Sequence, residues 1–391
     1  MLLAIGILMV DALYIFTKQL DQNLTKNTKG IDLVLGAKGS PMQIILSSIF
    51  YIDFPTGNIK IYEAEKLVRN RYIKQMIPIS LGDAYNGFRI VGTNHDYLTV
   101  FDAKVEQGRL WGDQELEVVI GAGVAKKLNL KLGDEFAGQH GLSGGYSHEE
   151  HGYEVVGIIT PTGTAIDRLI VTSLESVWEV HEEEVLGDSI TTEPKWSKIA
   201  PSVNLNSLDS LKEVTSLLIK YRSPMAAIQL PNYINGKTNM QAASPAMETA
   251  RLFTIVGVGV EVLEGFAYLL VFVAMLSVFI SLYNALRDRK YDLAIMRAMG
   301  ASKRRLFFTV LIEGMFITFI GGVIGILLAH GTLEIVVNLY TETGMIGFSG
   351  QELYAGEMYL ILAVLIIGIL SALLPALGVF KVDVSKVLSE E

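Results

Sequence analysis

Residues 265–305 have the sequence GFAYLLVFVAMLSVFISLYNALRDRKYDLAIMRAMGASKRR, an uncharged apolar run followed at once by a basic segment. The run Gly265–Leu286 contains no charged side chain. It is long enough to cross the hydrocarbon core of a bilayer, which takes a helix of about 20 residues. Because an excess of Lys and Arg marks the cytoplasmic side of a membrane, the segment 287–305 is typical of a cytoplasmic loop. This stretch therefore predicts an integral membrane protein.

Three further apolar segments are candidates for membrane helices. Leu306–Ala329 contains a single charged residue, and Met358–Leu374 contains none and precedes Pro375, which we expect to end that helix. Met1–Thr17 is shorter and carries Asp11. We interpret it as a first membrane helix whose shortness suggests that the native chain begins earlier. The alternative, a signal peptide, lacks a basic n-region and a small-x-small cleavage site.

The short loops predict how the chain is oriented in the membrane. The loop after the second helix is rich in basic residues and has only Asp288 and Asp292 against them. Its basic residues are Arg287, Arg289, Lys290, Arg297, Lys303, Arg304 and Arg305. The loop 331–357 contains no Lys or Arg and several glutamates, so we expect it on the opposite side. Both termini are then cytoplasmic, and the large polar segment that begins at Lys18 is exterior.

Composition excludes several classes of protein. Of the 391 residues, 50% are hydrophobic and 19% are charged, which is too apolar for an ordinary soluble protein. A net charge of −9 argues against nucleic acid as a partner, because no basic surface is available to neutralise phosphates. The absence of cysteine excludes disulfides and cysteine-based metal sites.

The exterior segment alternates strand and helix patterns, which predicts an α+β domain. Short β-branched runs predict buried strands at Val118–Ile120, Tyr153–Ile159 and Leu169–Val171. Helices are predicted at Tyr62–Arg71 and Ser173–Leu186, the second opened by Thr172 with Glu175 three residues later, the spacing of a capping box.

From Ser244, with Pro245 in a first-turn position, a helical pattern continues into the second membrane helix. We interpret it as a rigid stalk, although an ordinary juxtamembrane helix has the same pattern. The predicted division of the chain is: membrane helix 1–17, exterior α+β domain 18–243, stalk 244–264, membrane helix 265–286, cytoplasmic segment 287–305, membrane helix 306–330, exterior loop 331–357, membrane helix 358–375 and cytoplasmic tail 376–391.

The cytoplasmic segment contains a short amphipathic helix. Leu293, Met296 and Met299 recur at nearly helical spacing, and Gly300 is able to adopt the left-handed conformation that closes a helix. Ser302 is placed to cap the next helix. An apolar face in the cytoplasm indicates a protein partner, whereas a basic loop that serves only orientation is the simpler alternative.

This segment resembles the family of ABC permeases that includes the macrolide-exporter, lipoprotein-release and cell-division permeases. The family has a basic approach, an acidic residue and a Leu-Arg-x-x-Gly-Ala-Ser type ending; here Asp292 replaces the usual Glu and Met296 the usual Leu. The coupling residues that the resemblance implies are Arg289, Tyr291, Asp292, Leu293, Met296, Arg297, Met299, Gly300, Ala301 and Ser302.

The resemblance extends over almost the whole chain. Gly108-Arg109, Val118–Gly121, Leu128–Gly133 and Val155–Gly157 resemble the periplasmic core of the family. The tail resembles the family ending in Pro375-Ala376, Asp383 and Leu388, but Val384 stands where a proline is common. The resemblance implies a homodimeric inner-membrane permease that pairs with a separate cytoplasmic ATPase and passes its motion outward by mechanotransmission.

The sequence has no convincing ATP site of its own. Gly236-Lys237-Thr238 has the ending of a phosphate-binding loop, but Pro231 occupies the place of the first glycine. We therefore expect the chain not to be an enzyme.

The third membrane helix has two features of interest. Glu313 is an ionisable group in an apolar span, and we favour pairing with a basic neighbour or snorkelling over a functional role. Gly321 and Gly325 are four residues apart with Gly322 between them, which permits close helix packing, either within the chain or at a dimer seam.

A glycine-rich exterior loop contains His140 and the run His148-Glu149-Glu150-His151. Three imidazoles and two carboxylates are suitable ligands for zinc, although a solvated polar loop has the same composition. Catalysis does not follow from these residues.

We therefore expect a four-helix membrane protein with an α+β periplasmic domain, acting as the permease subunit of an ABC transporter that exports or extracts a substrate. Its expected partners are the ATPase, a second copy, the lipid bilayer and a periplasmic adaptor or substrate protein. One alternative is a membrane regulator that transmits ATPase state to a periplasmic enzyme. A membrane-anchored metal-dependent enzyme, which rests only on the histidines, is a third.

Overall fold

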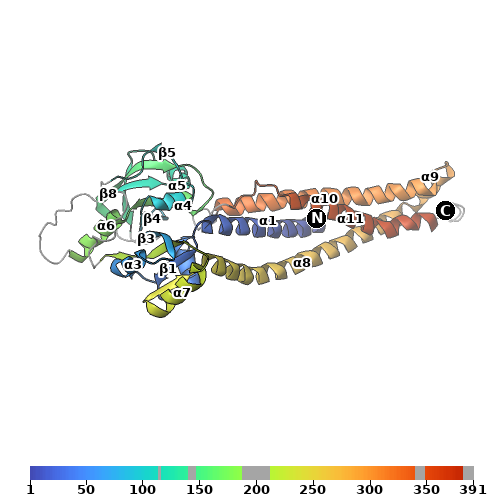
Figure 1. The fold of residues 1–391 in the computed structure, drawn as a ribbon. Helices are drawn as coiled ribbons and strands as arrows, with labels where there is room; N and C mark the ends of the chain where they lie inside the picture. Colours follow the sequence, from blue (N-terminus) through green and yellow to red (C-terminus); the bar gives the residue numbers. More distant parts are fainter. Residues whose placement is uncertain (113–115, 140–146, 187–211, 340–347, 382–391) are drawn as a thin grey trace. The chain divides into compact units, whose positions relative to one another are not determined.

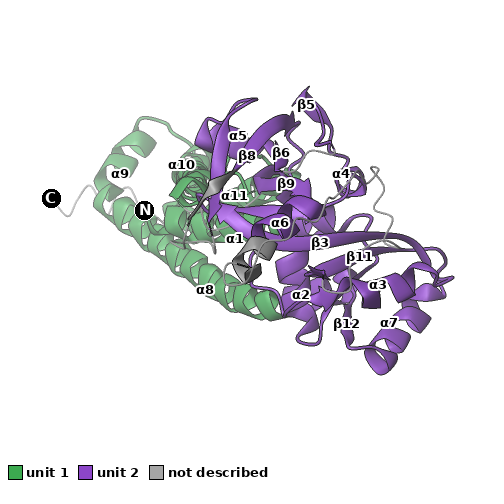
Figure 2. Cartoon of the chain, turned by 90° about the vertical axis from the view of Figure 1, so that its left-hand side faces the viewer, with its two compact units in different colours: residues 1–20, 254–341, 348–391 green, residues 21–253, 342–347 purple. Residues whose placement is uncertain are grey.

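The computed structural model describes residues 1–112, 116–139, 147–186, 212–339 and 348–381. The chain divides into two compact units, shown in different colours in Figure 2. One unit contains residues 1–20, 254–341 and 348–391 and holds the apolar helices. The other contains residues 21–253 and 342–347 and holds the sheet.

Four helices in the described residues are long and apolar enough to cross a membrane, as the four apolar runs predict. They are α1 (Leu2–Thr28), α8 (Pro245–Asp288), α10 (Lys303–Leu339) and α11 (Ala355–Gly378). A short helix, α9 (Lys290–Ala298), joins α8 to α10, and a 3-10 turn at Val379–Lys381 follows α11 (Figure 1).

Small residues bring α10 and α11 close together. A Cβ atom placed on Gly314 would lie 2.5 Å from that of Ala372, and one on Gly322 would lie 2.8 Å from Val364. Tight packing through small residues is the usual way in which membrane helices associate.

The helix bounds differ from prediction at several ends. α1 continues past Thr17 to Thr28, and its polar C-terminal part forms hydrogen bonds within the chain. The Asn27 side chain donates to the Asn23 carbonyl and accepts the Ala165 N–H. α11 passes through Pro375 to Gly378, so the prediction that Pro375 ends it was wrong. Pro375 lies in the last turn of α11, and the buried Pro375 and Ala376 continue its packed face.

The helix α10 is also longer than predicted at both ends, and its length shortens the following loop. It begins at Lys303 and continues to Leu339, nine residues past the predicted end at 330. α8 is one helix of 44 residues, so the pattern that begins at Ser244 is continuous with the second apolar run.

The second unit is built on a mixed ten-stranded sheet in the described residues. The strand order is β12-β1-β11-β3-β4-β9-β6-β8-β5, and β7 pairs with β3 and β8. The strands are β1 (Leu33–Ala37), β3 (Ile73–Tyr85), β4 (Phe88–Thr93), β5 (Val105–Gly108), β6 (Glu117–Ile120), β7 (Glu135–Gln139), β8 (Ser147–Ile159), β9 (Leu169–Ser173), β11 (Ser216–Tyr221) and β12 (Met240–Ala243). A separate pair is formed by β2 (Ile59–Lys60) and β10 (Glu213–Val214).

Helices pack on this sheet and complete the predicted α+β domain. They are α2 (Pro41–Ser48), α3 (Ile61–Val68), α4 (Asp96–Val100), α5 (Ala122–Leu128), α6 (Leu174–Leu186) and α7 (Ala226–Lys237). The three predicted strands are confirmed as β6, β8 and β9, with β6 parallel to β8 and antiparallel to β9. Their apolar side chains form one buried core with Val124 of α5.

The start of α6 corrects one predicted detail. Thr172 does not cap the helix, because its hydroxyl donates to the Glu117 carbonyl at 2.7 Å across the sheet. Ser173 takes that role, and its Oγ accepts the Ser176 N–H at 3.0 Å.

Candidate functional site

The helix α9 is fixed to the membrane unit by its buried side. Leu293 and Ala294 are buried, and Leu293 belongs to an apolar cluster at the start of α10 and the end of α11. The other buried members of this cluster are Leu306, Val310, Ala376 and Val379. A displacement of α9 would therefore be passed directly to these two helices.

The opposite side of α9 presents apolar side chains to its surroundings. Tyr291 and Met296 are exposed, and Met299 has 76% of its surface exposed. Methionine adapts to irregular partner surfaces, because its side chain is unbranched and its sulfur is polarisable. The exposed apolar face of α9 is thus defined as Tyr291, Met296 and Met299.

The end of α9 is a Schellman motif. The Ala301 N–H donates to the Met296 carbonyl at 2.9 Å, and the Gly300 N–H donates to the Arg297 carbonyl at 3.0 Å. Gly300 has a φ of 102°, a conformation that L side chains rarely adopt. This turn places Ser302 at the start of α10, where its Oγ accepts the Arg305 N–H at 3.3 Å.

An ion pair joins the segment before α9 to the membrane helix α10. Arg289 Nη1 lies 3.5 Å from Glu313 Oε1, and both side chains are partly exposed. The predicted basic neighbour of Glu313 is therefore a residue of the coupling segment itself. Asp292 lies in the first turn of α9, where a negative charge is favourable beside the helix N-terminus.

The glycines of α10 pack against two different helices of the same chain. A Cβ on Gly321 would lie 3.4 Å from Leu3, and one on Gly325 would lie 2.7 Å from the Ala4 carbonyl, so both face α1. Gly322 instead faces α11. α1 of the same chain therefore packs against Gly321 and Gly325.

The predicted metal ligands are only partly within the described residues. His140 lies outside them, and His148, Glu149, Glu150 and His151 belong to strand β8, whose side chains are not described at these positions. The expectation of a loop is wrong for this run, since β7 pairs with β8 from Gln139 opposite Ser147 onward. Zinc binding by these histidines stays a prediction.

Gly236 and Lys237 end α7, and Thr238 follows it. A phosphate-binding loop precedes a helix, so that the helix N-terminus faces the phosphates. The geometry of this segment is the reverse of that arrangement.

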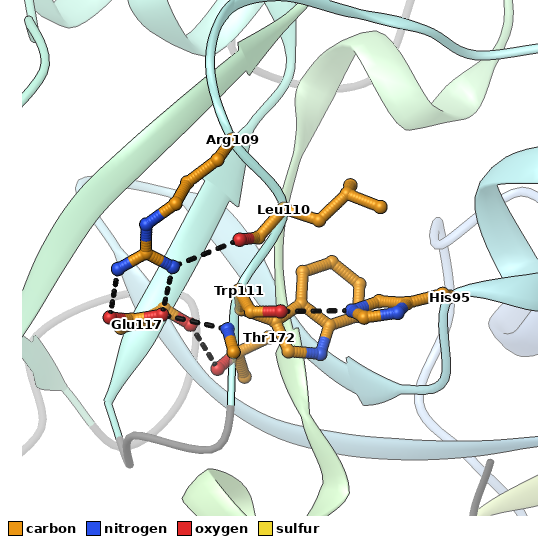
Figure 3. Close-up of polar contacts among 7 residues, drawn as sticks. His95, Arg109, Leu110, Trp111, Glu117 and Thr172 are labelled. Atoms are coloured by element: carbon orange, nitrogen blue, oxygen red, sulfur yellow. Dashed lines mark hydrogen bonds and ion pairs between the residues drawn. The ribbon is translucent and has the colours of Figure 1, made fainter. Parts of the chain in front are cut away.

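In the sheet domain, Arg109 and Glu117 form a bidentate ion pair (Figure 3). Glu117 is buried, and its Oε2 also accepts the Gly112 N–H at 2.8 Å. Arg109 also donates to the Leu110 carbonyl, and His95 contacts the Trp111 carbonyl at 3.0 Å. Hydrogen bonds and the positive charge of Arg109 hold the pKa of Glu117 below its usual value.

This ion pair joins the connection between β5 and β6 to the first residue of β6, next to Gly108. Gly108 has a φ of 79°, and a Cβ there would meet the Val156 carbonyl at 2.1 Å. A Cβ on Gly157 would meet the Arg109 carbonyl at 2.2 Å. Glu117 was not predicted from the sequence, because one glutamate before a β-branched run is common at the start of a strand.

Two family models cover most of the chain. The model of the FtsX-like permease C-terminal region matches residues 265–384, and that of the MacB-like periplasmic core domain matches residues 2–226. The chain belongs to the MacB/FtsX-type family of ABC permeases. This MacB/FtsX-type permease is thus a multi-pass membrane protein with a large periplasmic domain.

Solved structures similar to this permease are periplasmic or extracellular domains. The periplasmic region of MacB from Actinobacillus actinomycetemcomitans is 14% identical, covering 59% of this chain and 97% of that one, with a TM-score of 0.35. The extracellular domain of the noncanonic ABC-type transporter YknZ from Gram-positive bacteria is 14% identical, covering 54% and 99%, with a TM-score of 0.32. No curated protein sequence matches the chain.

Proposed function

We propose that this permease is the inner-membrane subunit of an ABC machine, in which a separate cytoplasmic ATPase binds the exposed apolar face of α9. The observation that carries the proposal is the two-sided construction of α9. One side is buried against α10 and α11 through Leu293, and the other leaves Met296 and Met299 exposed. A helix that is firmly attached on one side and apolar on the other is suited to transmit a partner's movement.

The charge pattern supports a cytoplasmic position for this face. The segment 287–305 is strongly basic, and the loop between α10 and α11 has no Lys or Arg in its sequence. α9 would then be accessible to an ATPase, while the sheet domain is accessible to periplasmic substrates and adaptors.

The helix α8 is the proposed route of motion to the periplasmic domain. It runs without interruption from Pro245, beside strand β12, to Asp288, one residue before the Arg289 that pairs with Glu313. A continuous helix transmits displacement along its axis better than a hinged connection, because its backbone hydrogen bonds resist bending. Substrate export or extraction at the periplasmic face is the proposed outcome.

A second copy is proposed to pack beside α8. Of the four apolar helices, α8 is the least buried: only 17% of its most apolar 18-residue segment is buried inside the protein. One set of its exposed apolar residues recurs at steps of three and four, the spacing of a helix–helix seam. They are Ile255, Val258, Val262, Phe266, Leu269, Val273, Leu276 and Ile280.

Site-specific photo-crosslinking in intact cells tests the proposed ATPase contact. A photoreactive amino acid at Met296 is expected to capture an ABC ATPase, whereas the same amino acid at Ile228 of α7, which is also exposed, is expected to capture none. Capture of no ATPase from Met296, with the permease correctly inserted, would refute the proposed contact.

A further inference from the structure

Three ionisable residues from three helices meet inside the membrane unit, at the periplasmic end of its apolar spans. They are Asp11 of α1, His330 of α10 and Glu357 in the first turn of α11. One ligand atom from each lies within 4.8 Å of the other two. Asp11 and Glu357 are buried, and the His330 side chain is nearly so.

Asp11 provides an independent sign that something is bound there. Its exposed fraction is 0%, and in the described part of the chain neither of its carboxylate oxygens has a hydrogen-bond partner. A buried carboxylate without a partner is costly, particularly in a membrane span, where such groups are retained for function. The site therefore presents an unsatisfied acceptor aimed at an imidazole and a second carboxylate.

The tautomer of His330 strengthens the argument. Its Nδ1 lies 2.6 Å from the Gly350 carbonyl, which only accepts, so Nδ1 carries the hydrogen. In the neutral ring the lone pair on Nε2 then faces Glu357 Oε2 at 3.2 Å, and that oxygen is also an acceptor. Two acceptors facing each other need a cation between them.

We propose that Asp11, His330 and Glu357 bind a divalent first-row metal ion of the zinc type. Two carboxylates and one neutral imidazole carry a charge of −2, which a divalent ion neutralises while satisfying all three residues at once. A proton on Nε2 would satisfy Glu357 but would leave Asp11 without a partner. Three protein ligands with one open position is a common coordination of zinc.

The distances suit such an ion. Zinc bonds of about 2.0–2.2 Å at a tetrahedral angle place ligand atoms roughly 3.3–3.6 Å apart. The separation of 3.2 Å between His330 Nε2 and Glu357 Oε2 is close to this. The ligand atoms of all three residues lie within 4.8 Å of one another. A short movement of the Asp11 side chain would therefore complete the coordination.

The surrounding backbone holds two of the ligands in place. The Nδ1–H of His330 is fixed by the Gly350 carbonyl, and Glu357 Oε1 accepts the Tyr354 N–H at 2.7 Å. Gly350 is in turn held by Glu334 of α10, which accepts its N–H at 2.9 Å. Partners of this kind orient metal ligands and are part of a metal site. A bound ion would tie α1, α10 and α11 together.

Zinc binding to the full-length permease in detergent tests the proposal. The parent for all variants carries His140→Ala, His148→Ala and His151→Ala, so that the three histidines predicted as exterior zinc ligands do not contribute. After chelator treatment, this parent is expected to bind one zinc ion per chain in a competition titration with a chromophoric chelator. The X-ray absorption spectrum of the bound zinc is expected to show only nitrogen and oxygen ligands, including one imidazole.

Asp11→Asn in this parent preserves the shape of the side chain and removes its charge, and it is expected to weaken zinc binding at least 100-fold. Glu313→Gln, which also removes a carboxylate from a membrane helix, is the matched control and is expected to leave binding unchanged. A folded parent that binds no zinc, or equal affinity in the parent and in Asp11→Asn, would overturn the proposal. Size-exclusion chromatography and thermal unfolding establish that each variant is folded.

Discussion

Replacing Met299 by Glu separates the role of α9 as a partner surface from its role in the fold. Met299 is 76% exposed, so the substitution removes almost no internal packing. Surface substitutions of this kind change stability by about 0.5 kcal/mol or less. We therefore expect Met299→Glu to insert and fold normally but to lose its ATPase.

The expected loss of binding free energy for the ATPase follows from the exposed surface of Met299. Full burial of a methionine side chain contributes about 1.5–3 kcal/mol, of which the exposed three quarters of Met299 would supply about 1–2 kcal/mol on binding. A glutamate in the same contact adds a desolvation cost of at least about 1–3 kcal/mol. The total of about 2–5 kcal/mol predicts ATPase binding that is weaker by roughly 30-fold or more.

The assay is co-purification of the ATPase with tagged permease, together with measurement of ATPase activity in the complex. Met247→Glu is the matched control, because Met247 is 71% exposed and lies at the periplasmic start of α8. If Met299→Glu retains as much ATPase as Met247→Glu, the proposed role of α9 is wrong.

Two further predictions concern the ion pair and the topology. Glu117 has a lowered pKa in the folded domain, so its contribution to stability is present above the usual glutamate pKa and is lost as pH falls through the lowered value. Glu117→Gln should therefore lower the free energy of unfolding by about 1–2 kcal/mol at pH 7 and reduce the fall in Tm between pH 7 and pH 3. An equal fall in the variant and the wild type would contradict this. Because the chain has no cysteine, Ser302→Cys and Ser349→Cys can be labelled singly in cells with a membrane-impermeant maleimide. Only Ser349→Cys should react before lysis, and reaction of Ser302→Cys instead would reverse the topology.

The membrane helices could be predicted because their cause is local. An uncharged run such as Gly265–Leu286 has few alternatives to a membrane helix, since every backbone polar group must be satisfied within the span. The ends were predicted less well because they depend on contacts distant in sequence. α1 continues to Thr28 partly because Asn27 accepts a hydrogen bond from Ala165, which no window around Thr17 could indicate.

The same distinction applies to the candidate sites. The Schellman ending of α9 depends on Gly300 and its immediate neighbours, so the sequence was enough to predict it. The pairing of Arg289 with Glu313 was predicted only as a need for some basic neighbour, because it depends on how α9 folds back on α10. The exposed side of α9 was indicated by helical spacing, but the burial of Leu293 rather than Met296 required the structure.

Asp11, His330 and Glu357 show why a buried polar site is difficult to predict from one sequence. Asp11 alone looks like a defect in a short apolar span, and Glu357 alone looks like an acidic residue in an exterior loop. His330 directly follows the predicted third apolar run and suggests only a helix end. More than 300 positions separate Asp11 from the other two. The three residues form a candidate site only when three helices pack together and leave the Asp11 carboxylate without a partner. An ionisable residue inside an apparent membrane span is therefore a reason to look for charged residues at the same depth on the other helices.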